Sequence, residues 1–296
     1  MEIGIWGGIM VKDYLELTVD EKDKTLLFID RNNGSISLSE MDRMFKSKVY
    51  GYGKGILILE QNNKVIGIGR IVLQEIKITG IAYIHFLDIL EDLDDTKEVI
   101  KELINECFTK AEEHKAKKIL LGFRKRETTE MLHEIGFDAD YEAKIMTLND
   151  REKREDILNI EEINENNIKE YIKLYNESFN NMPHGASLDE EEANGFLNES
   201  NTCNKYFIVS NSKVKIGVLN TTIEDNEGTF DIGLSSRFRG KGYGKRLLET
   251  AIDYLNKKKI PNIYLVVIET NKIAYNMYKK RGFEQQKVLS YWIKLK

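Results

Sequence analysis

The chain has 296 residues, of which 41% are hydrophobic and 31% are charged; this balance is typical of folded globular proteins and excludes a largely disordered chain. The length favours two domains of ordinary size. A net charge of −5 at pH 7 excludes a protein that coats nucleic acid along its whole surface, so any basic binding site must be local.

Cysteine and histidine usage argues against a disulfide framework and against a metal site. The two cysteines, Cys107 and Cys203, are far apart and form no Cys-x-x-Cys motif, which is typical of a reducing compartment. The four histidines show no metal-ligand spacing, so no metal is expected. The apolar run near the N-terminus is short and follows Glu2 rather than a basic region, and no run of about 18 apolar residues occurs. We therefore expect a cytoplasmic protein without a signal peptide or a membrane span.

The N-terminal half is predicted to contain a hairpin followed by alternating strands and helices. The hairpin is expected over residues 55–73 (GILILEQNNKVIGIGRIVL). The later elements are a strand, a helix, a strand, a helix and a strand, at residues 82–90, 96–114, 117–123, 127–137 and 142–148.

The C-terminal half has the predicted order β-α-α-β-β-β-α-β-α-β. Its first strand, at residues 156–161, precedes a helix at 164–179, for which Asn164 offers an N-cap. A loop with Pro183 and Gly185 leads to the second helix at 188–199. The other strands are expected at residues 205–210, 213–224, 228–235, 262–268 and 288–295. One helix is expected directly after the glycine-rich stretch at 240–244, and the last helix at residues 271–280.

The two halves can be aligned with each other. At a constant offset of 148 residues, the apolar positions of one helix match those of the other: Val99, Ile100, Leu103, Ile104 and Cys107 correspond to Leu247, Leu248, Ala251, Ile252 and Leu255. A period this long indicates a duplicated domain rather than a solenoid. The charged stretch 149–156 is expected to be a solvated linker, which predicts two domains at 1–150 and 151–296, each α/β with a mixed sheet.

The stretch Arg239-Gly240-Lys241-Gly242-Tyr243-Gly244 precedes an amphipathic helix and predicts an anion site. Glycines let a ligand approach the backbone closely, and the first turn of a helix offers unpaired N–H groups together with partial positive charge. The stretch is not a P-loop, because Lys245 stands where the second P-loop glycine would be. It is not a dinucleotide fingerprint either, because its spacing is G-x-G-x-G and several antiparallel strands precede it. The pattern that remains is R-x-x-G-x-G between a strand and a helix.

That pattern resembles the acyl-CoA-binding motif of the GNAT superfamily of N-acyltransferases. A second motif of the family, N-x-x-A-x-x-x-Y-x-x-x-G-F, is matched at the expected distance by Asn271, Ala274, Tyr278, Gly282 and Phe283. The close resemblance covers roughly residues 155–296, and the N-terminal half resembles the same fold only in its pattern. Two motifs in order, each on the expected element, make the resemblance specific.

The resemblance implies a role for each matched residue, with acetyl-CoA as cosubstrate and no metal. Backbone N–H groups of the glycine-rich stretch would hold the coenzyme pyrophosphate, and the strand ending at Leu234 would pair with the pantetheine arm in a gap that opens toward strand 262–268. Tyr278 would protonate the departing thiolate. The residues expected to bind the coenzyme are Leu234, Ser236, Arg239, Gly240, Lys241, Gly242, Tyr243, Gly244, Lys245 and Asn271. Ser236 stands where the family often has proline, which does not affect the pyrophosphate site.

Acyl transfer to an amine also requires a proton acceptor, because only a neutral amine attacks a thioester. Asp231 is the first candidate, since strand alternation places it on the face opposite Phe230 and Ile232. Glu224 and Glu227 are alternatives nearby, and simple solvation of these carboxylates remains open as well. His184 lies in the loop that borders the acceptor pocket in the family, or it is an ordinary exposed loop residue.

The first domain is expected to lack coenzyme binding. The offset of 148 residues places the acidic segment Glu91–Asp95 opposite the basic glycine-rich stretch, and carboxylates there would repel a pyrophosphate. With Gly136 aligned to Gly282, Leu132 stands at the position of Tyr278. The first domain is therefore interpreted as a degenerate copy that shapes the acceptor site or provides an interface.

Together these observations predict an N-acetyltransferase that moves an acetyl group from acetyl-CoA to a primary amine by direct transfer in a ternary complex. The acceptor is a small molecule or a peptide, and no nucleic acid or membrane partner is expected. The alternative functions are a non-catalytic sensor of acyl-CoA and a pure interaction module.

Overall fold

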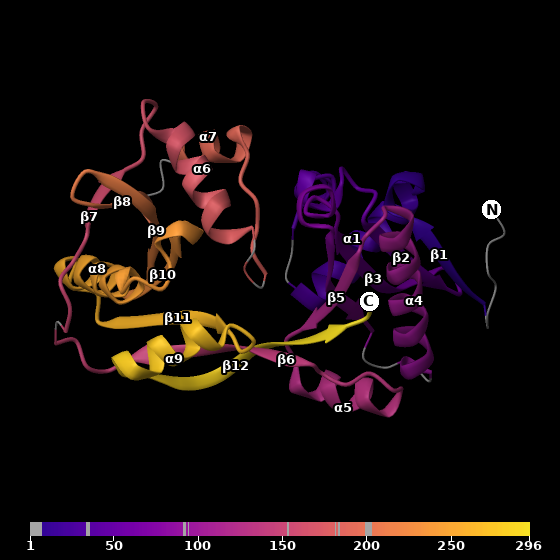
Figure 1. Ribbon diagram of the computed structural model, residues 1–296. Coiled ribbons are helices and arrows are strands. Elements are labelled where there is room, and N and C mark those ends of the chain that lie inside the picture. The colour runs from indigo at the N-terminus through magenta and orange to yellow at the C-terminus, as the bar shows by residue number, and fades with distance from the viewer. Residues whose placement is uncertain are drawn as a thin grey trace. The chain divides into compact units, whose positions relative to one another are not determined.

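The computed structural model describes residues 8–33, 36–90, 93, 95–152, 154–180, 182, 184–198 and 203–296. The chain forms two compact units (Figure 1). The first unit comprises Met1–Tyr141 and Ser290–Lys296, and the second comprises Glu142–Leu289.

One order of elements occurs twice along the chain, apart from a short extra helix, α3, in the first series. The first series is β1 (Ile9–Asp13), α1 (Val19–Asn33), α2 (Leu38–Phe45), β2 (Ile56–Gln61), β3 (Lys64–Val72), α3 (Ile76–Thr79), β4 (Ile81–Ile89), α4 (Thr96–Glu113), β5 (Lys118–Phe123), α5 (Arg126–Glu134) and β6 (Tyr141–Leu148). The second is β7 (Asn159–Glu162), α6 (Ile168–Phe179), α7 (Glu190–Asn198), β8 (Asn204–Asn211), β9 (Val214–Glu224), β10 (Glu227–Leu234), α8 (Tyr243–Lys257), β11 (Asn262–Ile268), α9 (Lys272–Arg281) and β12 (Phe283–Lys294). The repeat includes β1, α1 and α2, which the sequence pattern did not predict.

The first unit contains a mixed sheet in the order β1-β2-β3-β4-β5-β12. Its one parallel pair, β4 with β5, is connected by α4, and its other pairs are antiparallel. Helix α4 covers the sheet with the apolar residues that the alignment identified, including Val99, Leu103 and Cys107, all within 1% of full burial.

The second unit repeats this arrangement in the order β6-β11-β10-β9-β8-β7. Here α8 connects the parallel strands β10 and β11, and the other pairs are antiparallel. The matching positions of α8, among them Leu247, Ala251 and Leu255, lie in the core between α8, α9 and the sheet. The mixed α/β class predicted from the sequence is confirmed.

The two halves exchange their last strands. β6 ends the first series but pairs with β11 in the second unit, from Ala143↔Ile268 to Leu148↔Ile263. β12 ends the second series, and its residues Tyr291–Lys294 pair with β5 in the first unit. The compact units therefore divide between Tyr141 and Glu142 rather than at residue 150, and the last seven residues belong with the first unit.

The described residues of the charged stretch 149–156 are mostly exposed, and specific contacts also hold the stretch to the second unit. The Arg281 guanidinium donates to the carbonyl oxygens of Asp150 (3.0 Å) and Glu152 (2.8 Å). Arg151 donates to the carbonyls of Ile260 and Pro261. Backbone carbonyls thus fix the stretch to the second unit, which spacing and charge in the sequence do not show.

Candidate functional site

Strands β10 and β11 separate within the second unit. Their parallel register covers three pairs, from Glu227↔Asn262 to Thr229↔Tyr264, although β10 continues to Leu234 and β11 to Ile268. On its other edge β10 stays paired with β9 up to Leu234↔Gly217. The facing edges of the two strands therefore leave backbone groups unpaired with each other beyond Thr229, which is the gap that the family resemblance implied.

The glycine-rich stretch follows the open end of β10 and begins α8. Gly240 and Gly242 have φ values of +74° and +85°, in the left-handed region that favours glycine, and Gly242 is the N-cap of α8. A Cβ atom added at either glycine would meet no atom within 4 Å, so both face open space. Within the described ranges, the N–H groups of Gly240, Lys241 and Gly242 donate to no backbone carbonyl. Unpaired N–H groups at the start of a helix, open to solvent, form a site suited to an anion.

The Arg239 side chain is hydrogen-bonded to backbone carbonyls and holds this stretch against β10 and α6. Its Nε donates to the carbonyl of Leu234 (3.0 Å) and one terminal nitrogen donates to the carbonyl of Ser178 at the end of α6 (2.7 Å). Arg246 is similarly occupied by Asn211 (3.1 Å). The sequence alone does not separate such structural arginines from lysines that remain available to a ligand, because all lie within a few residues of the glycines.

The lysines and small residues of the stretch have different surroundings. Lys241 and Lys245 are exposed and form no ion pair in the part of the chain that the structure describes. A Cβ atom at Gly244 would lie 3.3 Å from Met277 Sδ, so glycine here lets α8 approach α9 closely. Tyr243 accepts a hydrogen bond at its hydroxyl from Asn211 (3.3 Å), and Ser236 is exposed at the start of a 3₁₀ turn, Ser236–Phe238.

Tyr278 lies on α9 with its ring in the core of the second unit and 9% of its surface exposed. Its hydroxyl has no hydrogen-bond partner among the residues described. Burial, followed by the nearby charge of Asp231, raises the pKa of Tyr278 well above its ordinary value, so the phenol stays protonated at neutral pH. Asn271 is the N-cap of the same helix, where its side chain accepts a hydrogen bond from the N–H of Ala274 (3.3 Å); its contact with the coenzyme stays a prediction.

Asp231 lies on β10 beyond the last β10–β11 pair, on the face opposite the buried Phe230. The residue as a whole is exposed, yet the protein around its carboxylate desolvates that group and raises its pKa above the ordinary value. Directly across the β9–β10 ladder, Asn220 accepts a hydrogen bond from the Tyr171 hydroxyl (2.7 Å). The charge of Asp231 also acts on the Tyr278 hydroxyl. The two residues predicted to move protons are therefore close enough to influence each other at the strand separation.

Other carboxylates differ in their placement. Glu224 and Glu227 pair with each other at the closed turn between β9 and β10, away from the separated ends of the strands. Glu177 on α6, which no sequence motif indicated, accepts a hydrogen bond from the Ser235 hydroxyl (2.7 Å) at the open end of β10. Only the packing of α6 against β10 reveals this carboxylate. His184 has a φ of +56° in the loop after α6.

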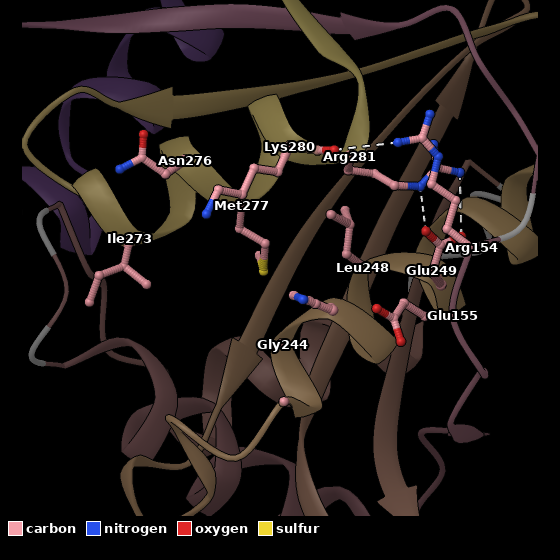
Figure 2. A pocket seen from close by; sticks show the side chains of 12 residues that line it. Arg154, Glu155, Gly244, Leu248, Glu249, Ile273, Asn276, Met277, Lys280 and Arg281 are labelled. Carbon is pink, nitrogen blue, oxygen red and sulfur yellow. Dashed lines mark hydrogen bonds and ion pairs between the residues drawn. The ribbon is translucent and has the colours of Figure 1, made fainter.

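A cavity of about 480 Å³ lies between α8 and α9 (Figure 2). It is lined by Arg154, Glu155, Gly242, Gly244, Lys245, Leu248, Glu249, Ile273, Asn276, Met277, Lys280 and Arg281. At one end, the buried side chains of Arg281 and Glu249 form an ion pair that joins the two helices. The cavity therefore adjoins the glycine-rich stretch through Gly242 and Gly244.

The corresponding strands of the first unit stay together for longer. β4 and β5 form five parallel pairs, from Ile81↔Lys118 to His85↔Gly122. Trp292 covers Gly122, since a Cβ atom there would lie 2.6 Å from the indole ring. Leu132, aligned with Tyr278, is a core residue at 1% exposure. Glu91, Asp92 and Asp94 of the acidic segment are outside the described residues, and only Leu93 and Asp95 are within them.

The described residues form neither a metal-binding cluster nor a membrane-spanning helix. They contain no group of three or more acidic, cysteine or histidine residues placed to hold a metal ion. None of their helices is both long and apolar enough to cross a membrane.

Residues 168–283 match the family model described as the acetyltransferase (GNAT) family. Over 65 residues the chain is 35% identical to an uncharacterized N-acetyltransferase from Methanocaldococcus jannaschii, covering 22% of this chain and 29% of the relative. Over 64 residues it is 33% identical to a [ribosomal protein bS18]-alanine N-acetyltransferase from Haemophilus ducreyi, covering 22% of this chain and 44% of the relative. The chain thus spans less than half the length of these curated relatives.

A crystal structure of a GCN5-related N-acetyltransferase from Sphaerobacter thermophilus has a similar fold along almost the whole chain. Its TM-score is 0.60 at 11% sequence identity, with 98% of this chain and 96% of that chain covered. At this identity the likeness concerns the fold alone.

Proposed function

Because residues 168–283 belong to the acetyltransferase (GNAT) family, we propose that the second unit transfers an acetyl group from acetyl-CoA to a primary amine. The observation that carries this proposal is the strand separation after Thr229↔Tyr264, which leads directly to the unpaired N–H groups of the glycine-rich stretch. An extended thioester with a pyrophosphate at one end has the shape and charge that suit these two features.

The residues present fit such a cosubstrate. The pyrophosphate would accept hydrogen bonds from the N–H groups of Gly240, Lys241 and Gly242, with Lys241 and Lys245 adding positive charge. The arm would lie along the free edge of β10 up to Leu234. The open space at Gly240 and Gly242 leaves room for close approach of the phosphates.

We assign the two proton transfers of the reaction to two side chains. Asp231, directly or through a water molecule, takes a proton from the ammonium group, so that a neutral amine attacks the thioester carbonyl. A C–N bond forms, the attacking nitrogen releases its second proton to solvent, and the C–S bond breaks. Tyr278 donates its proton to the sulfur, and the proton on Asp231 returns to the phenolate through solvent. The raised pKa of Asp231 supports its role, because this carboxylate holds a proton more readily. The raised pKa of Tyr278 means that the phenol is protonated before transfer.

This scheme uses no cysteine nucleophile. Cys107 is buried in the core of the first unit, and burial raises the pKa of its thiol. Direct transfer within a ternary complex is therefore the proposed course. Because acetyl-CoA is consumed, we also propose that the protein works in the cytoplasm.

The function is tested by incubating the protein with acetyl-CoA and a panel of amines, with detection of free coenzyme A thiol and of the acetylated product by mass. The panel contains polyamines, amino acids and a peptide beginning with alanine, because a relative is named for a ribosomal-protein alanine. Thiol release that depends on one amine supports the proposal. Tight binding of acetyl-CoA without turnover on any amine would instead indicate a sensor of acyl-CoA, and absence of binding would indicate an interaction module.

A further inference from the structure

A pair of side chains beside Asp231 has no part in the chemistry proposed above. Asn220 on β9 lies directly opposite Asp231 in the antiparallel β9–β10 ladder, so the two side chains leave the sheet on the same face. Helix α6 packs on that face, since a Cβ atom added at Gly233, two residues beyond Asp231, would lie 2.6 Å from Ser178 Cβ. Asn220 is bonded to Tyr171 of the same helix. Asn220 thus contacts α6 and faces Asp231 across the ladder.

Tyr171 fixes the orientation of the Asn220 amide. The Tyr171 side chain is fully buried, and its hydroxyl lies 2.7 Å from Asn220 Oδ1, its one hydrogen-bond partner among the described residues. A buried O–H group without an acceptor is costly, so the hydroxyl donates to this amide oxygen. Burial, and to a smaller extent neighbouring groups that include Asp231, raises the pKa of Tyr171 well above its ordinary value, so the proton stays in place at neutral pH. The amide nitrogen of Asn220 is then the end that remains available.

The available groups of Asn220 and Asp231 are complementary. In the part of the chain that the structure describes, the Asn220 N–H groups donate to no other group and the Asp231 carboxylate accepts no hydrogen bond. Side chains directly opposite in an antiparallel pair have Cβ atoms about 4.5–5.5 Å apart, within reach of a direct or a water-mediated hydrogen bond. An N–H donor stabilises the charged carboxylate, which is the form that a proton acceptor needs. Desolvation acts in the opposite direction, because it favours the protonated form.

One charged side chain shares these surroundings. The titratable side chains that lie toward Asp231 or its neighbours are Tyr171, Tyr175 and Glu177 from α6, Tyr206 from β8, Tyr264 from β11 and Tyr278 from α9. Phenols ordinarily titrate at about pH 10, so Glu177 is the member of this set that is charged at neutral pH. It accepts a hydrogen bond from the Ser235 hydroxyl (2.7 Å). The amide of Asn220 is therefore the group best placed to act on the Asp231 carboxylate.

We propose, on the premise of the function proposed above, that Asn220 and Tyr171 are positioning residues for Asp231. Tyr171 holds the amide oxygen of Asn220. The amide nitrogen donates to the Asp231 carboxylate, directly or through a water molecule, and keeps that carboxylate charged and oriented toward the acceptor amine.

The titration of Asp231 tests this pair without coenzyme or acceptor. In protein labelled with ¹³C at the aspartate side-chain carboxyls, the Asp231 signal is identified by its loss in Asp231→Asn. We expect Asn220→Ala to raise the pKa of Asp231 by about one unit, the usual effect of removing one hydrogen bond to a carboxylate. Tyr171→Phe should raise it by less. The double variant should raise it no further than Asn220→Ala, because Tyr171 acts through Asn220.

Two control variants remove similar groups elsewhere in the second unit. Thr222→Val changes the next residue of β9 on the same face, whose hydroxyl is bonded to Asn204 (2.8 Å). Tyr254→Phe removes a phenol hydroxyl from α8, which packs on the opposite face of the sheet. Both should leave the pKa of Asp231 unchanged. An unchanged pKa of Asp231 in folded Asn220→Ala and Tyr171→Phe would overturn the inference and leave the proposed function intact.

The pH dependence of acetylation gives a second readout, with an amine that the panel described above identifies. In Asn220→Ala the rise of the rate with pH should move upward by the same amount as the pKa of Asp231. Turnover should then fall about tenfold below that pKa and return toward the wild-type rate at high pH, with the KM for acetyl-CoA unchanged. A loss of rate that is equal at every pH would show a merely structural role and contradict the inference. If the pKa of Asp231 responds as expected but no amine is acetylated, the hydrogen-bonded pair stands and the proposed function is refuted.

Discussion

Gly242 provides the sharpest test of the pyrophosphate site. An added Cβ atom there meets nothing within 4 Å, so an aspartate side chain would project into the space that the pyrophosphate is proposed to occupy. Its φ of +85° is a strained conformation for most residues but one that aspartate and asparagine tolerate. Gly242→Asn is therefore a matched control with almost the same size and backbone preference as Gly242→Asp, but without the charge.

The size of the charge effect follows from Coulomb's law. Two unit charges about 4 Å apart interact by about 1 kcal/mol in water and by about 4 kcal/mol at a typical protein surface. A pyrophosphate carries two charges, so repulsion by the introduced carboxylate at a slightly longer distance should cost at least about 1.4 kcal/mol, or tenfold in affinity. We expect Gly242→Asp to bind acetyl-CoA at least tenfold more weakly than Gly242→Asn, with the gap narrowing as salt screens the charges.

Titration calorimetry at low and at high salt measures the difference in affinity between the two variants and its dependence on salt. Circular dichroism verifies that both variants are folded. Equal dissociation constants for the two variants, in folded protein at low salt, would show that no phosphate lies near Gly242. In that case the unpaired N–H groups of the glycine-rich stretch would need another explanation.

Three further predictions concern the chemistry and the division of roles between the halves. Tyr278→Phe keeps the buried ring but removes the proton, so turnover should fall by roughly 10²–10⁴ with acetyl-CoA affinity unchanged; a wild-type rate would show that another group protonates the thiolate. Asp231→Asn should lower the turnover rate and abolish the rise of that rate with pH. It should also raise the Tm at pH 7: the pKa of Asp231 is raised in the folded state, so the wild type loses stability as the pH rises through that pKa, whereas asparagine does not titrate. A lower Tm at pH 7 would contradict this account. One coenzyme should bind per chain and Gly242→Asp should weaken that site, whereas a stoichiometry near two would show a site in the first unit.

The core and the glycine-rich stretch were predictable because local spacing determines them. The apolar positions of α4 and α8, for example Leu103 and Ala251, follow from helical periodicity and from the offset between the halves, and they are buried in both units. The helix start after Gly242 follows from glycines before an amphipathic run. Helix α2 also carried a signal, since Ser37 and Glu40 form a capping box that spacing alone could have indicated.

Other features depend on contacts between distant segments and left no local signal. No sequence pattern in β6 or β12 indicates that β6 pairs with β11 and β12 with β5, each in the other half. Such pairing depends on the assembly of the whole sheet. The binding of Arg239 to the carbonyls of Leu234 and Ser178 depends on how α6 packs against β10. The same packing brings Glu177 to Ser235.

The length of the parallel strand pairing differs between the two halves and would account for a single coenzyme site in the second. In the second unit β10 and β11 separate after three pairs, whereas β4 and β5 of the first unit remain joined over five. Strand β12 then places Trp292 over Gly122, in a cluster with Tyr83 and Leu120. The pantetheine arm of the coenzyme needs a strand edge with unpaired backbone groups, and β10 offers such an edge in the second unit. In the first unit, β4 and β5 pair with each other over five residue pairs, so the same backbone groups are not available there. The two halves share one order of elements, and the shorter parallel pairing is a structural difference that marks the half proposed to be catalytic, besides Tyr278 and the glycine-rich stretch.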